Sequence, residues 1–298
     1  MDVGLYQYDS IRFDLERTLR EVRYLYANSG RIIEEEKAFL EKENVKLVVS
    51  DIASLPFEAA QALGIPAIGV GNFTWDWIYG SYAEQDERWN EVISRIRAGY
   101  SKASIFLQLP MHGDCSVFNR IVDVPLVARK AGRTREEIRS ILGVGAGERV
   151  ILVTFTSIEL AGEAYERIEK IAGVTFLYKD PLVFPLRGAL KINAPELSYQ
   201  EAVAAADAVL TKPGYGIVSD CVANATPMIY TERGPFPEYD VLVDTIRSEL
   251  SSVFLDHHDF YAGNWEGAIR RVLSQPAKVS KMRIDGAEVC AREIMGFL

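Results

Sequence analysis

The sequence predicts an α/β protein built from two domains, each with a parallel β-sheet flanked by helices. Short apolar runs typical of buried strands alternate with helical segments in the first half, and the same alternation resumes at about residue 149. The stretch between the two halves, about 122–146, is rich in Arg and Lys and is interpreted as a linker. We therefore expect a Rossmann-like N-terminal domain over residues 1–146, linker included, and a Rossmann-like C-terminal domain over 147–298.

The first half contains a strand–helix–strand unit, which is the building block of a parallel sheet. Apolar residues three and four positions apart, among them Leu15 and Leu19, predict helix before this unit. Pro56 and Gly64 fit the start and the end of the helix inside it. The expected elements are helices over about 10–43, a strand over 45–51, a helix over 56–63 and strands over 65–71 and 104–109.

The second half shows the same alternation with a more complete set of elements. A capping box, Thr134 with Glu137, predicts a helix start just before it. The expected strands cover 149–155, 175–178, 208–211 and 227–230, and the expected helices cover 163–172, 199–205 and 216–223.

Composition excludes several classes of function. The chain of 298 residues has a net charge of −9, which argues against a general affinity for nucleic acid or anionic membranes. Its three cysteines show no paired spacing and its three histidines are too few for a multi-histidine site, so no metal is expected. No apolar run reaches the roughly 20 residues of a membrane helix, and the N-terminus lacks signal-peptide features. A cytoplasmic location is the expectation.

The most informative segment joins a strand, a Gly-rich turn and a helix over residues 210–227. Gly214 and Gly216 permit positive φ and close approach of a ligand to the backbone, and the N–H groups at the helix start suit a diphosphate. Asp220, about one turn into the helix, is placed to accept hydrogen bonds from ribose hydroxyls, and Lys212 suits a phosphate. The alternative is that the glycines only make a tight turn and that Lys212 is simply solvated.

The wider pattern resembles the donor-binding segment of two-domain glycosyltransferases with the GT-B fold. It is similar to the branch related to the UDP-N-acetylglucosamine transferase of peptidoglycan synthesis (MurG-like). It is more similar still to the predicted glycosyltransferases that also form the N-terminal half of plant L-arabinokinases. Two specific blocks carry the resemblance, Lys212-Pro213-Gly214-Tyr215-Gly216 and Asn72-Phe73-Thr74-Trp75-Asp76. Supporting blocks lie at 4–10, 48–51, 77–79, 122–126, 220, 223–227, 230, 236–239 and 285–289.

The resemblance implies a donor site for a nucleotide sugar. In that group the Gly-rich loop meets the diphosphate, an acidic residue at the position of Asp220 holds the ribose, and the segment around Glu238 and Tyr239 faces the sugar. The implied donor-site residues are Lys212, Pro213, Gly214, Tyr215, Gly216, Asp220, Glu238 and Tyr239.

Two features depart from the family pattern. The family opens with a strand and a Gly-His-Gly-x-Gly-His loop, and nothing upstream of Val45 matches it. The N-terminal domain is thus expected to lack its first strand or strands, through truncation, a gene-model error or real loss, and the 45–51 strand would expose an apolar edge. The strand 149–155 should also run into glycines, whereas here Thr156 and Ser157 follow as substitute hydroxyl donors, with Glu159 placed unfavourably for a diphosphate.

On the first domain, the candidates have both functional and structural interpretations. Asp51 ends a buried strand, where open α/β sheets place ligands, and is the candidate catalytic base. Capping of the next helix is the alternative. Asn72, Trp75 and Asp76 follow another strand end and are the acceptor-side candidates, since aromatic rings there suit a sugar or an apolar acceptor. Packing between the domains is the alternative for the aromatic residues.

The resulting hypothesis is a glycosyltransferase that transfers a sugar from a UDP-type donor to an unknown acceptor. The resemblance implies inversion at the anomeric carbon and no requirement for a metal or further cofactor, because positioning and charge stabilisation carry the catalysis. The alternatives are a nucleotide-sugar-binding module without turnover and a kinase-associated domain as in arabinokinases. The donor sugar, the acceptor and the oligomeric state do not follow from the sequence.

Overall fold

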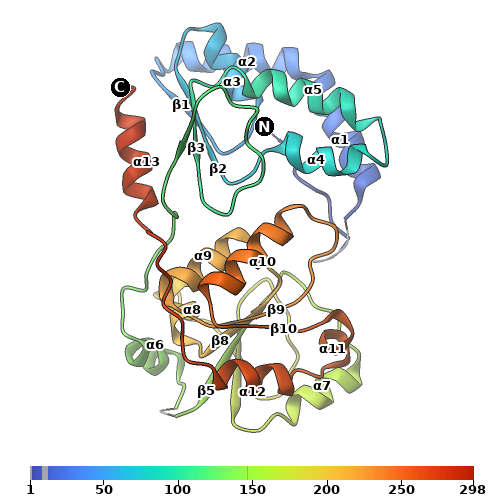
Figure 1. Cartoon of the computed structure of the whole chain (residues 1–298), viewed down its shortest axis with the longest axis vertical. Coiled ribbons are helices and arrows are strands. Elements are labelled where there is room, and N and C mark those ends of the chain that lie inside the picture. Colours follow the sequence, from blue (N-terminus) through green and yellow to red (C-terminus); the bar gives the residue numbers. More distant parts are fainter. Residues whose placement is uncertain (1, 9–12, 146) are drawn as a thin grey trace.

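The computed structural model describes residues 2–8, 13–145 and 147–298, which form two lobes stacked along the long axis of the molecule (Figure 1). Residues 9–12, of which 9 and 10 belong to the 4–10 block and 10–12 to the predicted helix, lie outside the described residues. The elements of the first lobe are α1 (Leu15–Ala27), α2 (Ser29–Lys42), β1 (Val48–Ser50), α3 (Leu55–Ala62), β2 (Ala67–Gly71), α4 (Trp75–Ala83), α5 (Trp89–Tyr100), β3 (Ile105–Gln108), β4 (Ile121–Asp123) and α13 (Gly286–Met295).

The second lobe holds the remaining elements. They are α6 (Arg135–Leu142), β5 (Arg149–Thr154), α7 (Gly162–Glu169), β6 (Val174–Tyr178), β7 (Leu190–Lys191), α8 (Tyr199–Ala205), β8 (Ala208–Thr211), α9 (Tyr215–Asn224), β9 (Met228–Tyr230), α10 (Glu238–Glu249), β10 (Ser252–Phe254), α11 (His257–Ala262) and α12 (Glu266–Ser274).

Two parallel sheets confirm the predicted α/β class. Strand order is β1-β2-β3-β4 in the first lobe and β10-β9-β8-β5-β6-β7 in the second, and every pairing between these strands is parallel. Side chains alternate between two apolar layers: on β3, Ile105 and Leu107 face the cluster that includes α13, and Phe106 faces the opposite cluster. Both faces of each sheet are thus covered, as parallel sheets require.

Strand β1 lies at the edge of the first sheet. Within the described residues it pairs with β2 alone, and Val49 at its centre is 49% exposed. The exposed apolar edge predicted for this strand is therefore confirmed.

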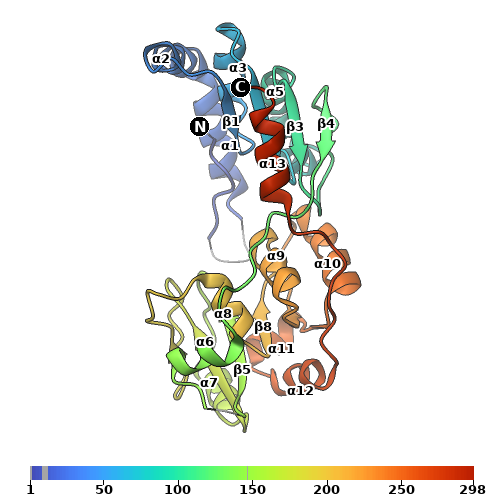
Figure 2. The same cartoon turned by 90° about the vertical axis from the view of Figure 1, so that its left-hand side faces the viewer.

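The two segments that cross between the lobes run side by side (Figures 1 and 2). The backbone N–H of Leu126 donates to the carbonyl of Arg283 at 3.0 Å, and that of Gly286 donates to the carbonyl of Leu126 at 3.1 Å. A Cβ on Gly286 would lie 2.1 Å from the carbonyl oxygen of Pro125, so only glycine fits there. Two blocks of the family resemblance, 122–126 and 285–289, thus form the connection between the lobes.

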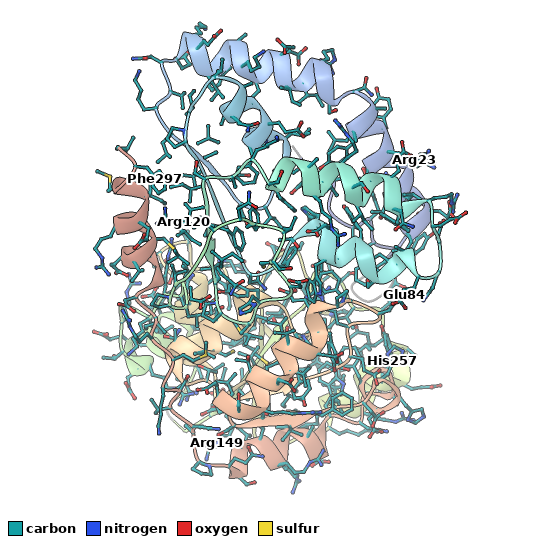
Figure 3. All side chains as sticks on the ribbon, turned by 45° about the horizontal axis from the view of Figure 1, so that its top comes forward. Arg23, Glu84, Arg120, Arg149, His257 and Phe297 are labelled. Carbon is teal, nitrogen blue, oxygen red and sulfur yellow. The ribbon has the colours of Figure 1, made fainter. Side chains whose placement is uncertain are left out.

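The lobes differ from the predicted domains at two places. Helix α13, placed by sequence in the 147–298 domain, packs on the first sheet through Val289, Cys290 and Ile294, and Phe297 just beyond it lies beside that lobe (Figure 3). The predicted linker, 122–146, contains part of β4 and all of α6. Three of its arginines pair with acidic residues of the second lobe: Arg133 with Glu201 at 2.9 Å, and Arg135 and Arg139 with Asp207 at 3.4 and 2.8 Å.

Candidate functional site

The carboxyl ends of the two sheets face each other across the junction of the lobes. Asn72, directly after β2, donates from Nδ2 to Oε1 of Glu238 at the start of α10, at 2.8 Å. The hydroxyl of Tyr82 in α4 donates to the carbonyl of Pro235 at 3.2 Å. Phe236 is 8% exposed, belongs to the apolar cluster of the first lobe and lies 5.7 Å, centroid to centroid, from the Phe13 ring. The β9–α10 connection therefore reaches into the first lobe.

A pocket of about 290 Å³ opens beside this junction, at the carboxyl ends of β5, β6 and β8. Three predicted donor-site residues line it, namely Thr156, Lys212 and Gly214. Lys179, directly after β6, and Tyr199, at the start of α8, line it as well. The lining also holds further hydroxyl groups and the carboxylate of Asp180, which pairs with Lys191 at 2.8 Å. The apolar floor, the two lysines and the hydroxyls suit an anionic ligand with a flat apolar part, and the pairing with Lys191 offsets the Asp180 charge.

The backbone of the Gly-rich turn is extended. Gly214 is extended, with φ −149° and ψ 148°, and neither Gly214 nor Gly216 has a positive φ. The turn, residues 212–214 between β8 and α9, therefore does not use the positive φ that the glycines permit. A Cβ on Gly216 would meet nothing within 4 Å, and one on Gly214 only Ile217 at 4.0 Å. The glycines therefore leave space above the backbone.

The same turn leaves the start of α9 without a side-chain cap. The first N–H groups of a helix have no partner within the helix and carry its positive dipole end. Gly214 and Lys212 of this turn line the pocket, so an anion there meets these N–H groups. The Tyr215 side chain packs against the apolar cluster of the second lobe, which leaves its backbone as the part available to a ligand.

Asp220 lies on α9 and is half-buried. It is close enough to Arg129, in the segment between β4 and α6, for the two charges to interact. Burial raises the pKa of Asp220 to about 6, and the Arg129 charge acts in the opposite direction. The Asp220 charge in turn contributes to the raised pKa of Tyr199, about 12, of which burial is the main cause. Asp220 is thus close to a residue that lines the pocket. Its role with ribose stays a prediction.

Glu238 is buried, at 3% exposure, and both of its carboxylate oxygens are occupied. Oε1 accepts from Asn72 and Oε2 accepts from Nη1 of Arg233 at 2.9 Å. The same Nη1 donates to the carbonyl of Pro213 in the Gly-rich turn at 3.1 Å. Tyr239 follows in α10 and packs against the apolar cluster of the second lobe. The structure thus connects three predicted residues, Asn72, Glu238 and Pro213, through one arginine.

In the first lobe, Asp51 and Trp75 share a neighbour. Nε1 of Trp75 donates to Oδ2 of Asp2 at 2.9 Å, and partial burial together with the Asp2 charge raises the pKa of Asp51. Ile52, next to Asp51, has a φ of +54°, a strained conformation for a β-branched residue. Its carbonyl accepts a 2.6 Å hydrogen bond from the buried hydroxyl of Tyr100. The loop that carries Asp51 is therefore held in place by packing.

The other acceptor-side candidates are engaged within the first lobe. Asp76 is 5% exposed and accepts from Nε of Arg97 at 2.8 Å, while its Oδ1 is buried without a hydrogen-bond partner. Trp75 stacks on Tyr79 with centroids 5.3 Å apart. These aromatic contacts lie inside one lobe and not between the lobes. Ser157 lies in the exposed loop after β5, beside Thr156.

Two residues of this region were not among the site residues predicted from the sequence. Lys179 comes directly after a predicted strand, and the carboxyl-end position was the signal that could have selected it. Arg233 has no such signal, because only the fold brings it to both Pro213 and Glu238.

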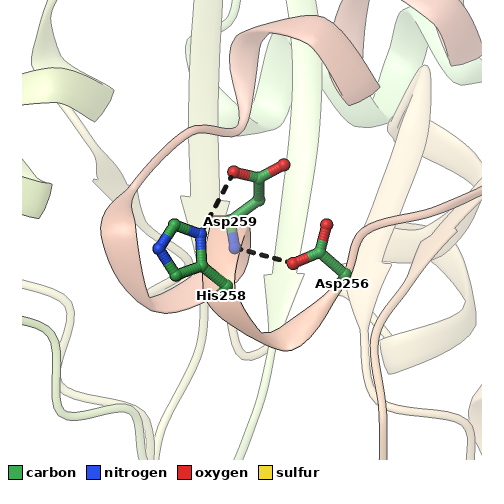
Figure 4. A group of neighbouring side chains, drawn as sticks. All are labelled: Asp256, His258 and Asp259. Atoms are coloured by element: carbon green, nitrogen blue, oxygen red, sulfur yellow. Dashed lines mark hydrogen bonds and ion pairs between the residues drawn. The ribbon is translucent and has the colours of Figure 1, made fainter.

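A group of possible metal ligands lies on α11 and at its N-cap, and none of its members lines this pocket. Asp256, His258 and Asp259 have ligand atoms within 4.8 Å of one another (Figure 4). The Asp256 carboxylate caps α11 by accepting from the Asp259 N–H at 3.0 Å, and Asp259 accepts from Asn264 at 2.9 Å. These bonds give the carboxylates a structural role. All three cysteines are buried free thiols, and no helix in the described part of the chain has the length and apolar character to cross a membrane.

Comparison with solved structures assigns the fold. The chain superposes on a glycosyltransferase of kitacinnamycin with a TM-score of 0.61 and 15% identity, covering 94% of this chain and 80% of that one. It superposes on the calicheamicin glycosyltransferase CalG4 with a TM-score of 0.55 and 15% identity, and the match covers 95% of this chain and 78% of that one. The chain therefore has the GT-B glycosyltransferase fold.

Comparison by sequence gives two distant relatives. The chain is 26% identical to an L-arabinokinase of Arabidopsis thaliana over 279 residues, which cover 92% of this chain and 27% of that protein. It is 25% identical over 307 aligned positions to an uncharacterized glycosyltransferase of Methanopyrus kandleri, which covers 96% of this chain and 86% of that protein. The chain thus spans about a quarter of the length of the arabinokinase. No protein-family model matches it.

Proposed function

We propose that the chain is a glycosyltransferase that binds a nucleotide-diphosphate sugar, with UDP as the expected nucleotide, in the second-lobe pocket. The observation that carries the proposal is the pocket itself, where the uncapped start of α9 meets Lys212 and Thr156. The name of the Methanopyrus relative supports the class of activity. The glycosyltransferase VinC, in complex with dTDP, superposes with a TM-score of 0.50 and 12% identity, and it supports a nucleotide diphosphate as the ligand.

In this proposal, charged and hydroxyl side chains bind the diphosphate in place of the glycines that the family pattern places after the 149–155 strand. The diphosphate lies over Gly214, where the first N–H groups of α9 and the ammonium groups of Lys212 and Lys179 meet its oxygens. The hydroxyl of Thr156 is a further donor. Asp220 accepts from the ribose hydroxyls.

The proposed reaction is a single displacement with inversion. The acceptor hydroxyl oxygen forms a bond to the anomeric carbon as the bond from that carbon to the diphosphate breaks, and the hydroxyl proton passes to the Asp51 carboxylate. The raised pKa of Asp51 supports this role, because a more basic carboxylate takes a proton more readily. The donors around Gly214 stabilise the departing diphosphate, so the scheme requires no metal ion.

A nucleotide-sugar-binding module without turnover is the second candidate. The Asn72–Glu238 contact favours it, because that contact occupies side chains expected to face the acceptor and the sugar. For the enzyme to act, this contact must open or rearrange when the donor binds. The cytoplasmic location and the N-terminal and C-terminal domain roles stay predictions.

The test is incubation of the chain with a panel of UDP-sugars and simple hydroxyl acceptors, with UDP release and transfer product measured by mass spectrometry. Transfer or donor hydrolysis that is lost in Asp51→Asn supports the enzyme. Saturable binding of UDP-sugars without UDP release supports the module, and no binding of any nucleotide diphosphate contradicts both.

A further inference from the structure

Arg233 lies between the donor turn and the contact that joins the lobes. Its guanidinium is mostly buried and lies over the Phe236 ring, 4.1 Å from the centroid. Nη1 donates to the Pro213 carbonyl and to Glu238, and Glu238 accepts from Asn72 of the first lobe. One arginine therefore bridges the Gly-rich turn to a side chain held by the other lobe.

The chemistry of this bridge makes its parts interdependent. Glu238 is the carboxylate that compensates the buried Arg233 charge, and Nε of Arg233 is buried without a hydrogen-bond partner. A partly satisfied buried cation depends strongly on the bonds that remain. If Glu238 loses Asn72 when the lobes separate, it becomes free to move, and Arg233 moves with it.

We propose that Arg233 is a positioning residue that couples the lobe contact at Asn72 to the conformation of the Lys212–Gly216 turn and the start of α9. The contact between the lobes and the binding of a ligand at the turn are then linked, and each favours the other by the same factor. The inference rests on the proposed function only in naming this turn as the donor-binding turn.

The experiment measures hydrogen exchange at the backbone amides of residues 218–220 in the full chain. Val218 N–H donates to the Gly214 carbonyl at 3.0 Å, so these amides report opening of the first turn of α9. Asn72→Ala and Arg233→Gln are each expected to speed exchange roughly five- to thirtyfold, because each removes hydrogen bonds to a buried charged group of the bridge. In the Arg233→Gln background, Asn72→Ala is expected to add nothing.

Matched controls remove similar groups outside the bridge. Asn119→Ala removes an amide that donates to the Ser101 carbonyl in the first lobe, and Arg247→Gln removes a guanidinium that donates to Tyr230 in the second. Neither is expected to change exchange at 218–220. If Arg233→Gln fails to fold, Arg233→Lys, which keeps the charge but loses the fixed fork of donors, takes its place.

Titration of UDP into the same variants separates the two claims. Unchanged exchange in Asn72→Ala, or additive effects in the double variant, overturns the coupling, even where UDP binds. A wild-type chain that binds no nucleotide diphosphate overturns the proposed function, while the exchange result still decides the coupling.

Discussion

Nδ2 of Asn72 lies 2.8 Å from Oε1 of Glu238, which follows it by 166 positions in the chain. The bond joins the carboxyl end of β2 in one lobe to the start of α10 in the other. Both residues were predicted for different substrates, Asn72 on the acceptor side and Glu238 at the donor sugar. Their contact brings together the places predicted for the two substrates.

Replacing Asp220 with Ala is expected to weaken UDP binding roughly 10- to 100-fold, because hydrogen bonds from the ribose hydroxyls to a carboxylate are lost. Calorimetric titration of UDP and of 2′-deoxy-UDP measures this. The wild type should prefer UDP, and the variant should lose that preference. Asp244→Ala, an exposed residue of α10, is the control. An unchanged preference in Asp220→Ala would refute the ribose role.

Nucleotide affinity is expected to depend on pH through Asp220. Burial raises its pKa to about 6, and only the ionised form accepts two hydrogen bonds. Affinity should therefore fall as the pH drops below about 6, by up to about tenfold per pH unit. Uridine is the probe, because it has no phosphate to titrate. A uridine affinity with the same pH profile in Asp220→Asn as in the wild type would contradict the prediction.

Lys179→Met is expected to weaken UDP binding roughly five- to tenfold and to leave uridine binding unchanged, because the lysine faces the phosphates in the proposed pose. The loss should shrink at high salt, since added ions screen a partly exposed charge pair. The control is Lys170→Met, at the exposed C-terminal end of α7, because it changes the net charge by the same amount outside the pocket. Equal losses for UDP and uridine would mean that Lys179 does not contact phosphate.

Asp76→Ala is expected to lower the free energy of unfolding by about 1–3 kcal/mol, because a part-buried charge-assisted bond to Arg97 is lost. Arg97→Ala should destabilise as well, since it leaves a buried carboxylate unpaired. Urea unfolding followed by tryptophan fluorescence measures both. UDP affinity should stay the same in both variants, and a stable Asp76→Ala variant with lost transfer would instead support an acceptor role.

Most of the second lobe could be predicted from sequence. Helix α8 and strand β8 have the predicted bounds, because a capping box at Ser198 and Glu201 and a buried apolar run are strong local signals. Helices α4, α5, α10, α11, α12 and α13 and strands β4, β7 and β10 were not predicted. The aromatic residues of α4 had two interpretations, a surface for ligands and packing between the domains, and in the structure they pack in a cluster within the first lobe.

Only the part of the candidate site that comes from one continuous segment could be predicted from the sequence. The Gly-rich turn and Asp220 follow each other in sequence, so their shared location has a local signal. The Arg233 bridge joins residues from three places in the chain, and the return of α13 to the first lobe depends on which apolar face it meets. Such contacts arise from tertiary packing, which local patterns do not encode.

The central claim is that the second-lobe pocket binds a nucleotide diphosphate, and titration calorimetry with UDP tests it most directly. The account predicts one site per chain, with affinity weakened in Lys212→Ala and in Asp220→Ala but not in Asp244→Ala. Absence of heat with UDP, dTDP and GDP, confirmed by unchanged thermal stability of the chain at millimolar nucleotide, would contradict it.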